Sequence, residues 1–366
     1  MSAPLFTPIT FRNLTLRNRI GVSPMCQYSS VDGFANDWHL VHLSSRAIGG
    51  AGVVMMEATG VTPEGRITPA CHGIWKDEHV EFLKRITDFV KGHGAAAAIQ
   101  IAHAGRKASH AAPWEGGKKL TSGGWEVIEP TPIPFLPEHG APHEMTIDDI
   151  NRTRDAFVAA ARRAVRAGFD IVELHGAHGY LLHEFLSPLS NHRKDAYGGT
   201  EENRFRFMLE TAHAVRAEVP KETVVGARLS CIDWAEGGLT IADSVRLSAL
   251  LKKEGVDFID CSSGALVADA KIQTGPNYQV PFAKEIREKA AIPTCAVGMI
   301  TEPQQANDII ANGEADMVFL ARAMLRDPYW PAHAAQVLGA ELDVPAQYLR
   351  GYSTDRLAAP RRKTGS

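Results

Sequence analysis

Short apolar segments alternate with longer amphipathic segments along most of the chain, and this alternation constrains the fold more than any other feature. The apolar runs have the composition of buried parallel strands and lie at residues 20–22, 52–57, 95–102, 169–174, 223–229, 257–262, 292–297 and 315–320. Helical patterns follow them at residues 36–48, 79–91, 146–167, 203–219, 241–254, 280–290, 302–312 and 327–338. Eight β/α units predict a single-domain, closed (β/α)8 barrel, a TIM barrel of the α/β class.

A doubly wound open sheet is the main alternative to a barrel. That fold would usually place a G-x-G-x-x-G motif after an early strand, and the chain has none there. Two additions to the barrel are expected, namely an N-terminal hairpin over residues 9–16 and a long insertion over residues 109–145 after the third strand. Barrel active sites lie where strands end, so we expect the insertion to be a lid or rim, the alternative being a loop without function.

Composition and length limit the classes of protein that fit this chain of 366 residues. The net charge of −3 argues against a general nucleic-acid binder. Apolar runs stay well short of the roughly 20 residues that a membrane span needs, and the N-terminal segment lacks a signal-peptide pattern. The five cysteines are scattered, with no C-x-x-C pair, which argues against a disulfide framework and a zinc cluster and favours a cytoplasmic location. Residues 1–352 are expected to form the barrel domain, and residues 353–366 a disordered tail.

The segment HGAHGY at residues 175–180 follows the fourth predicted strand. Two neighbouring imidazoles, His175 and His178, can hold an oxygen that becomes negative during a reaction, and the nearby phenol of Tyr180 can donate a proton. A metal-binding pair and two core histidines are the alternatives, because short motif matches carry a high risk of false positives.

Side chains that follow the carboxyl ends of barrel strands share one mouth. Gly298 and Arg322 follow the seventh and eighth strands, where barrels commonly bind phosphate through backbone N–H groups and an arginine. Gln100 and Arg228, from the third and fifth strands, suit the edge of a polar heterocycle. The sequence therefore predicts a phosphorylated planar cofactor with substrate above it. No metal is predicted, since a barrel metallohydrolase would place several carboxylates and histidines at these strand ends.

Four long motifs, in order, are similar to those of a known family. They are SPMCQY at residues 23–28, QIAHAGRK at 100–107, HGAHGY at 175–180 and SPLSNHRKDAYGG at 187–199. Together they resemble the Old Yellow Enzyme family, and Cys26 with Tyr28 resembles its thermophilic-like subgroup of bacterial NADPH dehydrogenases and xenobiotic reductases. The resemblance covers residues 5–352. It implies a tightly but non-covalently bound FMN and the reduction of activated alkenes, with NADPH or NADH as hydride donor.

The resemblance assigns a set of residues to the flavin. These are Ser23, Pro24, Met25, Cys26, Gly60, Gln100, Arg228, Gly298, Ala321 and Arg322. Cys26 would lie near the reactive edge of the flavin, the alternative being a buried structural thiol. Arg228 would face N1 and O2 and raise the flavin's potential. Ala321 stands where relatives usually have glycine, and Gly60 where they often have alanine.

The resemblance also implies the roles of residues around the substrate. His175 and His178 would hold the carbonyl or nitro oxygen, Tyr28 would add a hydrogen bond, and Tyr180 would protonate the α-carbon in a ping-pong cycle. Lys107 and Arg326 match positive positions near the cofactor or pocket rim, the alternative being solvated surface charge.

The C-terminal segment at residues 347–352 resembles one that reaches a neighbouring subunit's site. Arg350 would be the crossing residue of a homodimer or homotetramer, and Tyr352 stands where relatives have tryptophan. Two other functions stay open on the residues alone. They are a metal-dependent lyase or hydrolase that uses His175 and His178, and a flavin-binding sensor that works through Cys26. The sequence shows no ribose-reading motif that would set a preference between NADPH and NADH.

Overall fold

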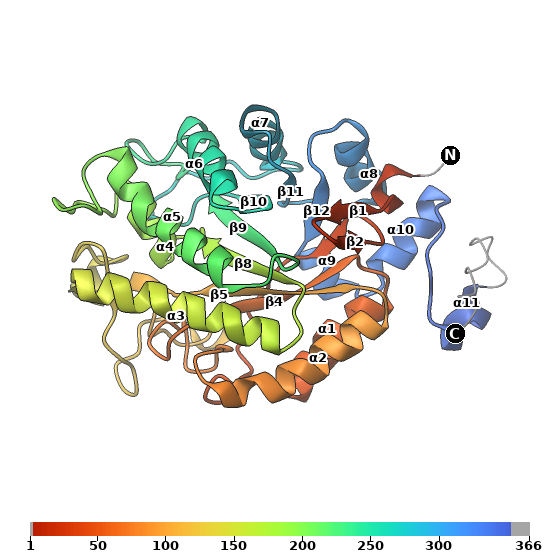
Figure 1. The fold of residues 1–366 in the computed structure, drawn as a ribbon, viewed down its shortest axis with the longest axis horizontal. Coiled ribbons are helices and arrows are strands. Elements are labelled where there is room, and N and C mark those ends of the chain that lie inside the picture. The colour runs from red at the N-terminus through yellow and green to blue at the C-terminus, as the bar shows by residue number, and fades with distance from the viewer. Residues whose placement is uncertain (1–2, 353–366) are drawn as a thin grey trace.

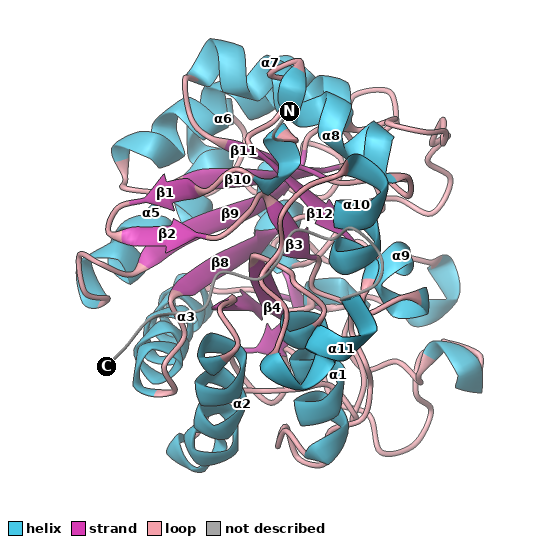
Figure 2. Cartoon of the chain, turned by 90° about the vertical axis from the view of Figure 1, so that its right-hand side faces the viewer, coloured by secondary structure: helices cyan, strands magenta, loops and turns pink. Residues whose placement is uncertain are grey.

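Eight parallel strands close into a barrel in the computed structural model, which describes residues 3–352 (Figures 1 and 2). Around the barrel the strands follow the order β10, β11, β12, β3, β4, β5, β8 and β9. Their bounds are β3 (Ile20–Val22), β4 (Val53–Gly60), β5 (Ala96–Ala102), β8 (Ile171–Gly176), β9 (Val224–Ser230), β10 (Phe258–Ser262), β11 (Thr294–Ala296) and β12 (Met317–Leu320). The predicted closed barrel is confirmed. The tail at 353–366 lies outside the described residues.

Helices cover the outside of the barrel. The eight that the sequence predicted are α1 (Asp37–Ile48), α2 (Val80–Gly92), α3 (Ile147–Arg166), α5 (Glu201–Glu218), α6 (Ile241–Lys253), α7 (Val280–Ala290), α8 (Pro303–Ala311) and α10 (Trp330–Leu338). The capping signal at the start of α3 is formed, because Thr146 accepts a hydrogen bond from the N–H of Asp149 and the Asp149 carboxylate accepts one from the N–H of Thr146. None of the helices described between residues 3 and 352 is long and apolar enough to cross a membrane.

Three short helices were not predicted. They are α4 (Leu181–Leu186), α9 (Arg322–Arg326) and α11 (Leu349–Tyr352). All six residues of α4 are buried, so the segment has no polar face and no helical alternation of polar and apolar residues. The other two have only five and four residues, which is too short for a periodic pattern to show.

The N-terminal hairpin closes one end of the barrel. It consists of β1 (Ile9–Phe11) and β2 (Leu14–Leu16), which pair antiparallel as predicted. Phe11 and Leu16 join a buried cluster with barrel-interior side chains such as Phe258 and Phe319. The hairpin therefore fills the amino-terminal end of the barrel, and ligands must approach from the carboxyl ends of the strands.

Two barrel strands extend at least two residues beyond their predicted ends. β4 continues to Gly60 and β8 continues to Gly176, because neighbouring parallel strands offer ladder partners there. Gly60 pairs with Ala102, and His175 pairs with Arg228. Gly60 and His175 therefore lie inside strands rather than in the following loops, and the tight turn begins only after Gly176.

Candidate active site

The HGAHGY segment forms a compact cluster of three rings at the end of β8. The backbone turns sharply there, with φ of +60° at His178 and +70° at Gly179. The ring of His175 lies nearly perpendicular to its neighbours, with centroid distances of 5.3 Å to His178 and 4.8 Å to Tyr180. The rings of His178 and Tyr180, predicted to act together with His175, thus both contact the His175 ring.

Both imidazoles are neutral at ordinary pH. Burial, and next the positive charge of Arg228, lower the pKa of His175 and of His178 well below the usual value. The N–H of Ala177 donates to Nδ1 of His175 at 3.3 Å, so the proton of this neutral ring lies on Nε2. His175 is therefore a hydrogen-bond donor through Nε2.

The second imidazole is oriented by a residue that sequence reasoning missed. Ser262 Oγ, at the end of β10, lies 2.7 Å from Nε2 of His178. When this hydroxyl donates to Nε2, the His178 proton lies on Nδ1, and both imidazoles offer one N–H each. The sequence showed Ser262 only as one of several small residues, and the barrel register brings it to His178.

Lys107 also binds the HGAHGY loop, through its side-chain ammonium. Its ammonium donates to the carbonyl of His178 at 2.9 Å and to the carbonyl of Ala265, and it lies 4.2 Å from the ring centroid of Phe135. Burial, and next the charge of Arg106, lower the pKa of Lys107 to about 8. These contacts make Lys107 part of the site rather than a solvated surface charge.

Cys26 and Tyr28 lie in the segment that follows β3. Burial, and next the carboxylate of Glu57, raise the pKa of the Cys26 thiol well above its usual value, although a hydrogen bond from Tyr28 acts in the opposite direction. Tyr28 has a φ of +47° and meets Trp114 of the insertion edge-on at 5.7 Å. A thiol that keeps its proton is a poor nucleophile, which disfavours the sensor function through Cys26.

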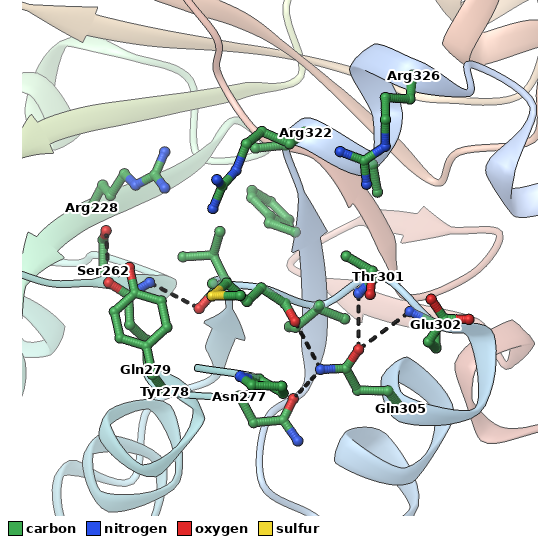
Figure 3. Close-up of a pocket in the computed structure, with 18 residues that line it drawn as sticks. Arg228, Ser262, Asn277, Tyr278, Gln279, Thr301, Glu302, Gln305, Arg322 and Arg326 are labelled. Atoms are coloured by element: carbon green, nitrogen blue, oxygen red, sulfur yellow. Dashed lines mark hydrogen bonds between the residues drawn. The ribbon is translucent and has the colours of Figure 1, made fainter. Parts of the chain in front are cut away.

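A cationic cavity of about 670 Å³ lies at the carboxyl ends of β9, β11 and β12 (Figure 3). Arg228, Arg322 and Arg326 line it, together with Gly298 and Ala321. Gly298 has a φ of +116°, and a Cβ there would lie 2.7 Å from Nε2 of Gln279. Arginine side chains and a backbone cradle that a side chain would fill could hold a phosphate group, the ligand that the strand order predicts here.

Beneath this mouth lies a buried polar layer that spans four neighbouring strands. Gln100 donates to Glu173 at 2.7 Å, and Arg228 Nε lies 3.2 Å from the carboxylate of Asp260. Burial is the main cause that raises the pKa of Glu173 and of Asp260. The two carboxylates sit inside apolar strand runs, and a charged residue in such a run is the sequence signal that could have revealed them.

Several buried polar atoms of the layer and its surroundings have no hydrogen-bond partner among the described residues. They include Ser23 Oγ and Glu173 Oε2. Buried donors and acceptors are rarely left unpaired, and unpaired ones suit the polar edge of a bound heterocycle. The residues at the mouth thus fit FMN in two respects, a cationic phosphate cradle and unsatisfied polar groups beside it.

Other predicted flavin residues do not line the cationic cavity. The N–H of Gly60 donates to the carbonyl of His72 at 2.9 Å, and Gly60 borders a separate, much smaller pocket. The backbone N–H of Ala58, two residues earlier, lies within hydrogen-bond reach of the Cys26 sulfur and was missed. Gln100 belongs to the buried layer, and Pro24 and Met25 lie, partly exposed, in the segment after β3.

The crossing residue predicted from the C-terminal segment lies far from these groups in the fold. α11, which carries Arg350, lies outside the ring of helices beyond α10 (Figure 1). Nearby, the hydroxyl of Tyr348 lies 3.2 Å from that of Tyr329. Arg350 lines neither the cationic cavity nor the pocket beside Tyr28 and Tyr180.

The insertion is anchored to the site by a buried acidic pair. Its short parallel strands β6 (Ile128–Glu129) and β7 (His143–Glu144) bring Glu129 to within 3.9 Å of Arg106 Nε, whose backbone N–H donates to Glu184 at 2.9 Å. Burial raises the pKa of both Glu129 and Glu184, and one guanidinium offsets only part of this effect. At least one of the two carboxyl groups therefore keeps its proton at neutral pH.

We expect the protein to lose stability as the pH rises from 6 to 9.5. A carboxyl group whose pKa is raised in the folded state contributes its full stability below the unfolded pKa, and this contribution is lost as the pH rises through the folded pKa. The urea midpoint should fall in this range, and it should fall less in Glu184→Gln, which cannot ionise. An equal fall of the urea midpoint in both proteins would contradict the explanation that a protonated carboxyl group of Glu129 or Glu184 stabilises the fold.

Among residues 3–352, no group of three or more His, Cys, Asp or Glu side chains is arranged so that it could hold a metal ion.

Comparison with known proteins agrees with this site. The sequence profile of the NADH:flavin oxidoreductase / NADH oxidase family matches residues 4–341. The chain is 49% identical to an NADPH dehydrogenase of Geobacillus thermodenitrificans (strain NG80-2), over 96% of this chain and 99% of that protein. It is 47% identical to an NADPH dehydrogenase of Bacillus subtilis (strain 168), over 96% of this chain and 100% of that protein.

Solved structures with this fold extend the comparison. Morphinone reductase superposes with a TM-score of 0.76 at 26% identity, over 94% of this chain and 92% of that chain. Old Yellow Enzyme from Pichia sp. AKU4542 superposes with a TM-score of 0.76 at 25% identity, over 92% and 87%. The chain spans about half of a longer protein, a 2-naphthoyl-CoA reductase, with 53% of that chain covered at a TM-score of 0.83 and 27% identity. The chain therefore belongs to the NADH:flavin oxidoreductase / NADH oxidase family of FMN-dependent oxidoreductases, which shares its barrel with Old Yellow Enzyme.

Proposed function

We propose that the protein is an NADPH dehydrogenase of the ene-reductase type, which reduces the activated C=C bond of α,β-unsaturated carbonyl or nitro compounds. The observation that carries the proposal is the pair of neutral imidazoles in contact with a phenol beside a cationic cavity. The names of the curated relatives, and a structure of morphinone reductase with tetrahydroNAD, support a nicotinamide hydride donor. The chemistry that bound FMN supplies is hydride transfer, from NADPH and then to the β-carbon of the alkene, in a ping-pong cycle.

The residues of the mouth hold the cofactor in two parts. Arg322 and the backbone N–H groups at Gly298 and Ala321 bind its phosphate. Arg228, from the buried layer, and Gln100 bind the polar edge of its ring, with residues 23–26 alongside. The positive charge of Arg228 would stabilise negative charge at that edge of the ring and so would raise the reduction potential of a bound FMN.

The histidine pair holds the oxygen of the substrate. His175 through Nε2–H and His178 through Nδ1–H donate to the carbonyl or nitro oxygen, and Tyr28 adds a third donor. Donors already oriented in a buried site stabilise the negative charge that develops on this oxygen without further reorganisation. This interaction polarises the C=C bond and makes its β-carbon accept hydride.

Tyr180 supplies the proton for the α-carbon. Burial raises the pKa of Tyr180 well above its usual value, so the phenol stays protonated until the reaction. A weak acid is sufficient for this step, because the α-carbon that it protonates has carbanion character. Water then returns a proton to the phenolate.

The proposal includes assembly into a homodimer or homotetramer in which Arg350 reaches a neighbouring subunit's site. Its support is the position of α11 outside the helical ring, away from the cationic cavity and from the pocket beside Tyr28 and Tyr180, neither of which Arg350 lines. A protein that stays monomeric at micromolar concentration would exclude this part of the proposal.

An anaerobic absorbance spectrum tests the function directly. The purified protein should show the bands of oxidised flavin, lose them on addition of NADPH, and regain them on addition of 2-cyclohexenone. A colourless protein that does not bind added FMN would contradict the proposal, and His175 and His178 would then have a structural or metal-binding role. Bleaching of the flavin bands by NADPH without their recovery on addition of 2-cyclohexenone would support a bound flavin but exclude this class of substrate.

Substitution Arg322→Ala should weaken FMN binding. The guanidinium makes a charge-assisted contact with the phosphate, and loss of such a hydrogen bond costs about 1.5–3 kcal/mol, or roughly 10- to 150-fold in Kd. Titration of the apoprotein with FMN, followed by the quenching of flavin fluorescence, measures the change. The control Arg246→Ala removes an exposed arginine of α6 and should leave Kd unchanged. The same Kd in the Arg322 variant would exclude the phosphate role.

A further inference from the structure

A second cavity, of about 710 Å³, lies between the reacting side chains and the insertion. Tyr28, Lys107 and Tyr180 line its inner end, and residues of the insertion, together with Ile67, line the rest. The insertion residues include His110, Gly116, Gly117, Lys118, Lys119, Phe135, Glu138 and His139. No residue lines both this cavity and the cationic cavity that suits the FMN phosphate.

The outer wall of this second cavity is basic. Lys118 and Lys119 contribute two ammonium groups there, against the single carboxylate of Glu138. His110 and His139 lie edge-on behind them, with ring centroids 4.8 Å apart, and Nδ1 of His139 is buried without a hydrogen-bond partner among the described residues. The excess of donors and positive charge selects an anionic ligand.

The two lysines stand on an ordered turn. Gly116 and Gly117 have φ of +99° and +61°, values that glycine adopts without strain, and they turn the chain just before Lys118. The N–H of Ala111 then donates to the carbonyl of Lys118 at 2.8 Å, and Lys119 pairs with His110 in an isolated β-bridge. Lys119 also donates from its ammonium to the carbonyl of His139.

The ammonium group of Lys118 is available to bind a ligand. It is exposed, and it makes no hydrogen bond or ion pair with other described residues. Lys107 is different, because its ammonium is already bound to the carbonyls of His178 and Ala265 at the inner end. The anion-binding capacity of the cavity therefore lies at its outer end, away from the reacting ring atoms.

The histidine pair contacts one lining residue of each cavity. Ser262 lines the cationic cavity and bonds to His178, while Tyr180 lines the second cavity and contacts His175. The proposed reaction needs two phosphate-bearing ligands whose rings meet beside the histidine pair. The arginine-lined cavity accounts for the phosphate of FMN. The lysine-lined cavity can then hold the phosphate groups of the second ligand, the nicotinamide dinucleotide.

We propose that Lys118 and Lys119 bind the phosphate groups of the nicotinamide dinucleotide that donates hydride, a proposal that rests on the proposed function. The nicotinamide would lie at the inner end, against Tyr28 and Tyr180, and the rest of the dinucleotide would extend along the insertion. Its pyrophosphate and its 2′-phosphate share the chemistry that ammonium groups recognise, and kinetics can separate the two.

The double substitution Lys118→Ala with Lys119→Ala tests the proposal in the FMN-loaded protein. We expect KM for NADPH to rise about 10- to 100-fold with kcat nearly unchanged, since the lost contacts are distant from the reacting atoms. An equal rise with NADH would identify the pyrophosphate as the bound group. A rise with NADPH alone would identify the 2′-phosphate, and 2′,5′-ADP should then bind the variant more weakly in a calorimetric titration.

Two further variants keep the test decisive. Lys118→Glu leaves the contact between Lys119 and His139 intact, so a weakened insertion cannot explain its effect on KM. Lys253→Glu reverses an exposed charge on α6 and should leave KM unchanged. Wild-type values of KM for both nucleotides in the two Lys118 variants would overturn the proposal. The proposed function itself fails separately, if NADPH does not bleach the wild-type flavin.

Discussion

Replacement of His178 by alanine is expected to slow the reduction of 2-cyclohexenone by about 10²–10³-fold, the usual effect of removing one donor to a developing oxyanion. The physical reason is that the pair of neutral imidazoles then offers only one N–H, from His175, to the substrate oxygen. FMN should remain bound, because neither the arginine-lined cavity nor the buried layer includes His178.

Stopped-flow mixing of the reduced protein with the enone measures this rate apart from reduction by NADPH. A phenol, which mimics the substrate oxygen, should also bind more weakly and can be followed by absorbance. The control His213→Ala removes an exposed histidine of α5, 2.8 Å from Glu254, and should behave as wild type. Unchanged phenol affinity in the His178 variant would exclude the role of this residue in holding the oxygen.

Replacement of Asp233 by alanine is expected to lower the free energy of unfolding by about 3–5 kcal/mol, because three buried donors then lose their acceptor. Asp233 is fully buried and accepts hydrogen bonds from three groups. They are His183 Nε2 at 2.9 Å, Ser187 Oγ at 2.6 Å and the N–H of Leu239 at 2.7 Å. Burial acts to raise the pKa of Asp233, but His183 and the hydrogen bonds outweigh it, so the pKa is lowered and the carboxylate stays charged.

The same substitution should also disturb the site. Nδ1 of His183 accepts from the N–H of Gly179 at 2.9 Å, so Asp233 holds the HGAHGY loop through His183. Urea denaturation gives the stability change, with Asp155→Ala, an exposed carboxylate on α3, as the control that should change little. A midpoint within the error of wild type would show that the Asp233 network does not stabilise the fold.

The difference between predicted and unpredicted parts of the site follows from how far each contact reaches along the chain. The two histidines and the tyrosine proposed to act in catalysis lie within one segment of six residues, and the strand before them shows a local apolar pattern. Ser262, Asp260 and Asp233 act on groups 84, 32 and 50 residues away, respectively. No local pattern marks such partners, because only closure of the barrel brings their strands or loops together.

The end of β4 shows the limit of local pattern more directly. The sequence placed Gly60 just beyond its strand, whereas the strand continues through Gly60 and the Gly60 N–H donates to the carbonyl of His72, so only the strand end was wrong and the flavin contact of Gly60 stays a prediction. The position of a backbone N–H depends on where the sheet ladder ends. That point is decided by the neighbouring strand, not by residues next to Gly60.

The sequence by itself determined the barrel, its N-terminal hairpin and the chemical groups at the strand ends, because strand and helix periodicity and the order of strand ends are properties of local pattern. Only the tertiary structure decided the protonation of those groups. His175 and His178 are neutral because surrounding side chains desolvate them beside Arg228, and Cys26 stays a thiol because its neighbours desolvate it beside Glu57. Burial and charge depend on all neighbours in space, so they emerge only when the barrel has closed.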